Sequence, residues 1–321
     1  MITEPEAARF AQVAGRLADN IELVIRGKRD VIELALTCLF AAGHLLIEDV
    51  PGTGKTSLAR CLAASLDASL QRIQFTPDLL PSDVTGMTIY NQGTKNFDFH
   101  RGPVFANLVL GDEINRASPK TQSALLEVME EHQVTVDGKA HTVPRPFMVI
   151  ATQNPVDMDG TYPLPEAQLD RFLIRTGVGY PDLDSELEVL ETQRSGSTID
   201  QLSSVVPGGT VQEMTAVATR VHIADALMRY LVTVVAATRK QTGVRIGASP
   251  RGSLALARAA RAFAAAQGRR YVLPEDIKAL AVPVLAHRLI LTPEAEIKGR
   301  TAADLVEEAL AATPVPTRRS A

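Results

Sequence analysis

Short apolar runs and helically spaced apolar positions alternate along the first half of the chain. Three runs, at 44–50, 108–110 and 147–150, are bounded by turn residues or by polar residues, which is typical of buried strands. Residues with helical spacing separate these runs. Because strands and helices follow one another in this order, we expect an α/β fold with a parallel central sheet.

Helical periodicity continues to the end of the chain, and no further strand is predicted after Tyr180. The predicted helices cover 5–20, 29–42, 55–66, 119–132, 184–195, 211–220, 223–240, 249–266 and 274–289. We therefore expect an α/β core with N-terminal helices over 1–180, a helical domain over 181–312 and a flexible tail over 313–321.

Two predicted β-hairpins interrupt the α/β pattern. Residues 88–100 alternate apolar and polar positions around a turn at 91–93, and residues 133–143 alternate around Asp137-Gly138. An Asp-Gly pair between alternating segments is a strong signal for a type I′ turn. Such insertions are either surface decoration or contact sites for a partner or substrate, and the pattern is compatible with both.

The composition is that of an ordinary globular protein. Of 321 residues, 45% are apolar and 22% are charged, which allows a large buried core. The net charge of -4 gives no long-range attraction for nucleic acid or anionic membranes. No signal peptide and no run of about 18 apolar residues is recognisable. We expect a cytoplasmic protein without membrane insertion, and the composition argues against nucleic-acid binding.

A glycine-rich segment joins the first predicted strand to the helix 55–66. Its sequence VPGTGKTS ends in the Gly-Lys-Thr of a phosphate-binding P-loop. Lys55 can neutralise the β and γ oxygens of ATP, and the Thr56 hydroxyl can ligate Mg²⁺. Loop N–H groups and the helix N-terminus can bind the phosphates. The predicted nucleotide-binding residues are Pro51, Gly52, Thr53, Gly54, Lys55, Thr56 and Ser57.

One position departs from the general P-loop pattern. That pattern places a glycine five residues before Gly54, where this chain has Asp49. A carboxylate there would add negative charge close to the bound phosphates. We therefore expect the Asp49 side chain to turn away from them.

Polar residues follow the other two predicted strands. In LVLGDEIN, Asp112 and Glu113 come at the strand end, which is the edge where open α/β sheets bind ligands. Asp112 is predicted to hold Mg²⁺ through water, and Glu113 to act as the general base for the attacking water. Asn154, in ATQNP, lies at the same edge, where it either orients water or γ-phosphate or simply begins a turn.

The order of these motifs resembles the MoxR family of AAA+ ATPases. VPGTGKT is followed by GDEINRASPKTQSALLEVMEE, ATQNP and LPEAQLDRF, and the resemblance runs from about residue 10 to beyond 290. It implies an AAA+ core, a helical lid and a homo-oligomeric ring, expected to be hexameric, with active sites shared between neighbours. EDVPG is a form of the loop that this family commonly uses, which agrees with Asp49.

The resemblance also assigns site residues. Arg171, in LPEAQLDRF, matches the arginine finger that would reach the γ-phosphate bound by the adjacent subunit; Arg175 is the second choice. Arg251, in ASPRGSLAL, matches the sensor 2 arginine, which contacts nucleotide from the same chain. The loop VIRGKRD, around Gly27, is a candidate for the adenine side of the site.

For function, the resemblance favours an ATP-driven, chaperone-like remodeller or maturation factor for protein complexes. Similar proteins typically act with a partner that carries a von Willebrand factor A domain. The hairpins 88–100 and 133–143 resemble the helix-2 insert and the pre-sensor-1 hairpin. A nucleic-acid translocase, a metal-chelatase motor subunit and an ATP-gated scaffold are the alternatives. The acidic balance and the 4% aromatic content argue against the translocase, and no residue identifies the protein client.

Overall fold

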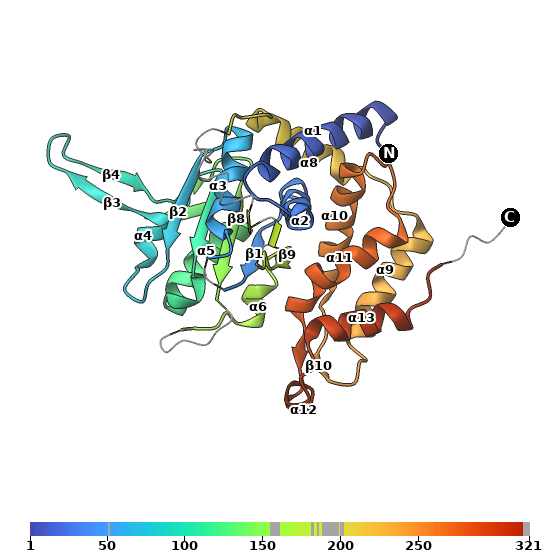
Figure 1. The fold of residues 1–321 in the computed structure, drawn as a ribbon. Coiled ribbons are helices and arrows are strands. Elements are labelled where there is room, and N and C mark those ends of the chain that lie inside the picture. Colours follow the sequence, from blue (N-terminus) through green and yellow to red (C-terminus); the bar gives the residue numbers. More distant parts are fainter. Residues whose placement is uncertain are drawn as a thin grey trace.

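The computed structural model of the protein describes residues 1–50, 52–154, 161–180, 183–184, 186–187, 199 and 202–316. A parallel sheet forms the centre of the first part of the chain, and the helices of the second part gather on one side of it (Figure 1). The expected α/β core followed by a helical lid is confirmed.

The central sheet has five strands in the order β2-β5-β8-β1-β9, and every neighbouring pair is parallel. Its strands are β1 (Leu45–Glu48), β2 (Leu70–Gln74), β5 (Leu108–Asp112), β8 (Met148–Gln153) and β9 (Ile174–Thr176). The three predicted strands are β1, β5 and β8, which occupy the middle of the sheet. The outer strands β2 and β9 were not predicted.

Alternate side chains of the sheet enter two different hydrophobic clusters, as expected for strands that are covered on both faces. On β1, Leu45 and Ile47 join a cluster that also contains N-terminal and lid residues, whereas Leu46 joins the cluster that contains Leu125 of the helix α5. Because all neighbouring strands are parallel, their carboxyl ends lie together at one edge of the sheet.

The predicted helices of the core are confirmed within a few residues. They are α1 (Glu4–Glu22), α2 (Arg29–Phe40), α3 (Lys55–Leu66) and α5 (Pro119–Glu131), with the short helices α4 (Pro81–Thr85) and α6 (Glu166–Leu169) between them. Thr3 and Glu6 form a capping box at the start of α1. The Ser118 side chain caps α5, which has proline at its first position. These signals fix where both helices begin.

Both predicted hairpins are present. They consist of β3 (Gly86–Asn91) with β4 (Asn96–Arg101), and of β6 (Gln133–Val136) with β7 (Lys139–Thr142). The first projects from the core on the side opposite the lid (Figure 1). The rings of Phe99 and His141 stack with centroids 4.1 Å apart, so the two hairpins contact each other near their bases.

The lid is helical, apart from a small pair formed by β10 (Val244–Ile246) and β11 (Ile290–Leu291). Its helices are α8 (Gly208–Thr219), α9 (Asp225–Thr238), α10 (Pro250–Ala266), α11 (Pro274–Leu285), α12 (Pro293–Ile297) and α13 (Ala302–Ala312). The helices α12 and α13 were not predicted. The predicted helix 184–195 lies mostly outside the described residues, as does the part of the predicted tail from 317 onward.

The N-terminal helices pack against the lid as well as against the sheet. Phe10 of α1 and Leu256 of α10 are fully buried in the same hydrophobic cluster. The division at residue 180 remains a prediction, because this cluster continues across it. Within the described residues, no helix is long and apolar enough to cross a membrane.

Candidate active site

The P-loop connects β1 to α3, as the sequence predicts. Gly52 and Gly54 both have φ of +88°, a conformation that is strained for residues with a side chain. A pocket of about 360 Å³ opens beside the loop and the first turn of α3. Its lining residues are Gly52, Gly54, Lys55, Thr56, Ser57, Asp112, Glu113, Thr152 and Asn154. Most predicted site residues therefore meet in one place, while Pro51 lies outside the described residues.

Lys55 is held across the loop that precedes it. Its Nζ donates hydrogen bonds to the backbone oxygens of Asp49 at 2.7 Å and Val50 at 2.8 Å. The buried Thr53 does not line the pocket but donates through Oγ1 to the same Val50 oxygen. The ammonium group thus already lies at the loop, where it can bind phosphate oxygens.

The structure accounts for the acidic residue at the start of the loop. Asp49 Oδ2 accepts hydrogen bonds from the N–H groups of Val178 at 2.9 Å and Gly179 at 2.6 Å. Its Oδ1 accepts one from the N–H of Val50. Burial raises the pKa of Asp49, but these bonds and one from Thr53 hold that pKa below its ordinary value. The carboxylate therefore ties the loop to the segment after β9 and has its own donors there.

Asp112 is fixed by two other residues at the carboxyl edge of the sheet. Its Oδ2 forms an ion pair with Arg72 of β2 at 2.6 Å, and its Oδ1 accepts a hydrogen bond from the hydroxyl of Thr152 at 2.6 Å. Asp112 is buried, and these two partners fix the orientation of its carboxylate.

Glu113 has an uncommon backbone conformation for a residue with a side chain. Its φ of 56° and ψ of 51° lie in the left-handed region, and such residues concentrate at functional sites. The Glu113 N–H donates to Thr152 Oγ1 at 2.9 Å. Its Oε2 accepts from Arg116 at 3.0 Å and from Gln74 at 3.1 Å. Thr152 thus contacts both residues of the acidic pair.

The donors in this pocket fit a magnesium ion bound together with phosphates. Among the described residues, no group of three or more His, Cys, Asp or Glu could hold a metal by itself. The pocket does contain the hydroxyl of Thr56 and the carboxylate of Asp112. Mg²⁺ usually binds through one or two carboxylates, substrate phosphates and water. These two residues suit that role, and ATP would supply the other ligands.

Four residues of this network were missed in the sequence: Arg72, Gln74, Arg116 and Thr152. Arg72 and Gln74 are two residues apart on β2, so both side chains point to one face. Recognising β2 as a strand would have revealed them. Thr152 belongs to the string ATQNP, two residues before Asn154, and Arg116 lies three residues after Glu113. Because both residues belong to motifs that were already recognised, these positions could have indicated that the two side chains lie at the site.

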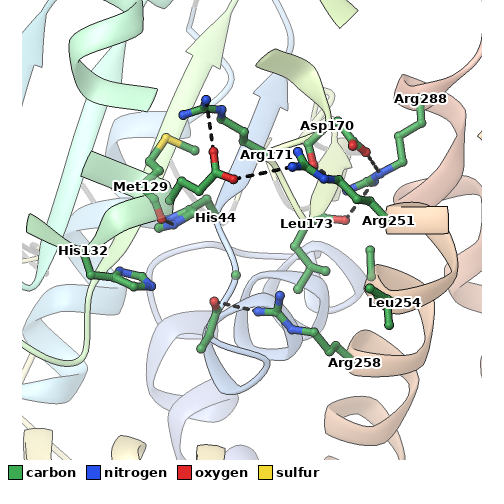
Figure 2. A pocket seen from close by; sticks show the side chains of 14 residues that line it. His44, Met129, His132, Asp170, Arg171, Leu173, Arg251, Leu254, Arg258 and Arg288 are labelled. Atoms are coloured by element: carbon green, nitrogen blue, oxygen red, sulfur yellow. Dashed lines mark hydrogen bonds and ion pairs between the residues drawn. The ribbon is translucent and has the colours of Figure 1, made fainter. Parts of the chain in front are cut away.

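A second pocket, of about 280 Å³, lies between the core and the lid (Figure 2). We call it the arginine pocket, because Arg171, Arg251, Arg258 and Arg288 all line it. The dashed lines in Figure 2 mark hydrogen bonds and ion pairs among these residues. Arg171 Nη2 lies 3.1 Å from Glu130 Oε2, and Arg251 Nη2 lies 3.6 Å from Glu130 Oε1. The predicted arginine finger and the predicted sensor 2 arginine thus share one carboxylate.

The arginine pocket and the P-loop pocket share no lining residue. Arg251, at the start of α10, lies beside Arg171 of the core. Arg251 does not line the P-loop pocket, and its contact with nucleotide of its own chain stays a prediction. Arg175 lies elsewhere, on β9, where it pairs with Glu48 of β1 at 2.9 Å.

The lid holds the segment that carries Arg171 through two buried side chains. Arg288 Nε lies 2.8 Å from Asp170 Oδ1, and Arg288 Nη2 donates to the oxygen of Phe172 at 2.6 Å. His287 Nε2 lies 3.0 Å from the same Phe172 oxygen. The Arg288 side chain is only 3% exposed. Its contacts connect the lid to the residues on both sides of Arg171.

The predicted adenine-side loop lies near the segment that Asp49 binds. Gly27 has a φ of 65° and joins α1 to α2. The neighbouring Lys28 donates through Nζ to the oxygen of Tyr180 at 2.7 Å. Gly27 does not line the P-loop pocket, and its role in nucleotide binding stays a prediction.

Comparisons with known proteins agree with this architecture. The family model "ATPase family associated with various cellular activities (AAA)" matches residues 44–174, and "AAA lid domain" matches 236–309. YeaC of Bacillus subtilis is 50% identical over 307 residues, covering 96% of both chains. Chaperone MoxR1 of Mycobacterium tuberculosis is 44% identical over 285 residues, covering 86% of this chain and 75% of the other.

A solved structure of a candidate ATPase from Cytophaga hutchinsonii is also similar. It has a TM-score of 0.91 and 40% sequence identity, and the match covers 98% of each chain. The AAA family match implies an ATP-binding site and suggests oligomeric assembly. Together with the P-loop, the acidic pair and the helical lid, these matches show that the chain belongs to the MoxR family of AAA+ ATPases.

Proposed function

We propose that this protein hydrolyses Mg-ATP in the P-loop pocket. The observation that carries the proposal is the meeting of Lys55, Asp112 and Glu113 around that pocket. Lys55 neutralises charge on the β and γ oxygens as it develops in the transition state. Glu113 accepts a proton from the attacking water as general base, and Thr152 fixes the backbone from which Glu113 projects. Asn154 borders the same space and orients the water or the γ-phosphate.

Thr56 and Asp112 would hold the magnesium ion in this scheme. When bound, the ion neutralises charge on the phosphate oxygens. Both Asp112 oxygens already accept hydrogen bonds or ion pairs from Arg72 and Thr152. We therefore propose that Asp112 contacts the ion through water rather than directly.

Arg171 and Arg251 act on the nucleotide of a neighbouring subunit in this proposal. Three observations support it: the two arginines share Glu130, their pocket is separate from the P-loop pocket of the same chain, and the family suggests oligomeric assembly. For Arg251 this replaces the prediction of a contact within its own chain. The assembly is proposed to be a hexameric ring.

The proposed role of hydrolysis is chaperone-like remodelling of protein complexes, with a partner that carries a von Willebrand factor A domain. A relative is named a chaperone, and the lid contacts the Arg171 segment through Arg288, so lid rotation would reach the neighbour's site. The first hairpin offers a contact surface for the client, because Tyr90 and Phe97 are 48% and 72% exposed near its tip.

Steady-state ATPase assays over a range of protein concentrations test this function. We expect Mg-dependent turnover whose rate per subunit rises with concentration, as shared sites require. Lys55→Ala should lose nucleotide binding. Turnover that persists in Lys55→Ala would overturn the assignment of the P-loop pocket. A rate per subunit that stays constant from dilute monomer upward would leave an ATPase but remove the ring.

A further inference from the structure

Glu130 connects the two arginines that we propose to act on a neighbouring nucleotide. It lies near the end of α5, whereas Arg171 follows α6 and Arg251 begins α10. Three separate elements therefore meet at one carboxylate, with one oxygen for each arginine. Such an arrangement is set by tertiary packing and not by neighbouring positions on one helix.

The other charges of the pocket have different partners. Arg288 pairs with Asp170, and Arg258 donates to the backbone oxygens of Ala41 and Ala42 at 2.6 and 2.9 Å. Of the two carboxylates that line the pocket, Asp170 is thus engaged by Arg288, and Glu130 serves Arg171 and Arg251. Arg171 also donates to the backbone oxygen of Leu126.

Both ion pairs of Glu130 can be exchanged. The Glu130 side chain is 43% exposed, and those of Arg171 and Arg251 are 29% and 64% exposed. Solvent-exposed pairs contribute little to stability. A guanidinium group binds carboxylate and phosphate with the same donor geometry, and a phosphate offers more charge and more oxygens. A phosphate that entered the arginine pocket would compete directly with Glu130.

We propose that Glu130 is a positioning residue that occupies the phosphate site of Arg171 and Arg251 until a triphosphate of a neighbouring subunit displaces it. This inference rests on the proposed function. The carboxylate keeps the two guanidinium groups together and ready, and it also competes with the incoming phosphate. Removing its charge should therefore strengthen engagement between subunits.

The direct test is Glu130→Gln, which keeps the size of the side chain and removes its charge. The protein concentration that gives half-maximal ATPase rate per subunit should fall by about twofold to tenfold, the range expected when two exposed ion pairs no longer compete. Glu131→Gln is the matched control, because Glu131 is the next residue and is exposed. Glu130→Asp retains the charge and should behave more like wild type.

A binding measurement isolates the arginine pocket from the P-loop pocket. In a Lys55→Ala background, inorganic tripolyphosphate should bind more tightly after Glu130→Gln, again by about twofold to tenfold. Adding Arg171→Ala should abolish that gain. A purely structural role of Glu130 would not produce this dependence on Arg171.

The outcomes separate the two levels of the proposal. If Glu130→Gln lowers turnover or leaves the half-maximal concentration unchanged, while wild type keeps its concentration dependence, the competing role of Glu130 is wrong and the shared-site ATPase survives. An unchanged tripolyphosphate affinity would likewise reject the competing role of Glu130 and would leave the shared-site ATPase standing. If the wild-type rate does not depend on concentration, the shared sites and the role of Glu130 are both overturned.

Discussion

The P-loop pocket and the arginine pocket differ in how their charged groups are held. In the P-loop pocket, the side chains of Lys55, Asp112 and Glu113 each have two or more hydrogen-bond or ion-pair partners. Most of these partners lie in the sheet or in the loop itself. In the arginine pocket, Arg171 and Arg251 share the half-exposed Glu130, and one of them comes from the lid.

This difference indicates two kinds of site. Groups fixed by a rigid sheet are preorganised for catalysis. Groups held by exposed ion pairs at the junction of core and lid can change partners at low cost. The first pocket therefore suits the chain's own nucleotide, and the second suits a ligand brought by a neighbour.

The largest expected effect is that of Glu113→Gln on the P-loop pocket. Turnover should fall by about 10²–10⁴, the usual contribution of a general base. ATP should still bind, because the loop and Lys55 are unchanged. Steady-state ATPase assays and titration with a fluorescent nucleotide measure the two quantities. Normal turnover would show that Glu113 is not the base.

Arg171→Ala and Arg251→Ala each remove one guanidinium group from the arginine pocket. Each should lower turnover at least about tenfold, since arginines that stabilise transition-state charge contribute this much or more. Nucleotide affinity should stay close to wild type, because neither residue lines the P-loop pocket. Arg229→Ala, at an exposed lid position, is the control. A large loss of affinity with unchanged turnover would place these arginines at their own chain's nucleotide.

The connection between Arg288 and Asp170 is expected to matter for stability. Asp170→Asn leaves the charge of Arg288 buried without its carboxylate, which should cost about 3–5 kcal/mol in the free energy of unfolding. Urea denaturation measures this cost. The double variant Asp170→Asn/Arg288→Met should lose less than the sum of the single variants. Strictly additive losses would show that the two side chains do not stabilise each other.

A histidine of the arginine pocket should make the free energy of unfolding depend on pH. His44, which lines this pocket, is buried, and burial lowers the pKa of His44 to about 4. In the unfolded chain this histidine binds a proton near pH 6.5, whereas in the folded chain it stays neutral until about pH 4. The free energy of unfolding therefore falls as the pH drops through this range. The loss should reach about 3 kcal/mol at pH 4. Burial lowers the pKa of His287 in the same direction.

Urea unfolding at several pH values between 7 and 4 measures this loss. His44 accepts a hydrogen bond from the N–H of Val149 at 3.0 Å, while its other ring nitrogen lies 3.1 Å from the oxygen of Met129. His44→Gln can keep one of these bonds but cannot titrate, so it should reduce the pH dependence. An equally steep pH dependence of the free energy of unfolding in that variant would show that other groups cause it.

The smallest expected effect is that of Asp49→Asn beside the P-loop. The amide offers only one accepting oxygen, so at least one of the bonds from Val50, Val178 and Gly179 should weaken, at a cost of about 1 kcal/mol. Because the pKa of Asp49 is lowered in the folded state, its contribution is present above about pH 4 and is lost as pH falls below that value. Thermal melts of both forms at neutral pH and at pH 3 check this.

The P-loop pocket could largely be predicted from the sequence because its residues belong to local motifs. The strands β1, β5 and β8 contain continuous apolar runs. Asp112, Glu113 and Asn154 lie at or directly after the carboxyl ends of β5 and β8, and Lys55 begins α3 after the glycine-rich loop that follows β1. Of the five residues of the edge strand β2, only Ile73 is buried. No apolar run marked this strand, and its contribution to the pocket was therefore missed.

The arginine pocket depends on how distant elements pack. Nothing in the local sequence of Glu130, Arg171 or Arg251 indicates that the three residues meet, because they are brought together by the placement of the lid on the core. The family resemblance selected the two arginines. Only the three-dimensional arrangement shows that they share Glu130 and that neither lines the P-loop pocket.

Mixing two inactive variants tests whether each reaction combines a P-loop from one subunit with arginines from another. Glu113→Gln retains its arginines, and Arg171→Ala retains its general base. We predict that each is nearly inactive alone and that the mixture recovers part of the wild-type ATPase rate, because some interfaces then combine an intact Glu113 with an intact Arg171. A mixture no more active than the sum of its components, under conditions where mixed assemblies form, would contradict shared active sites.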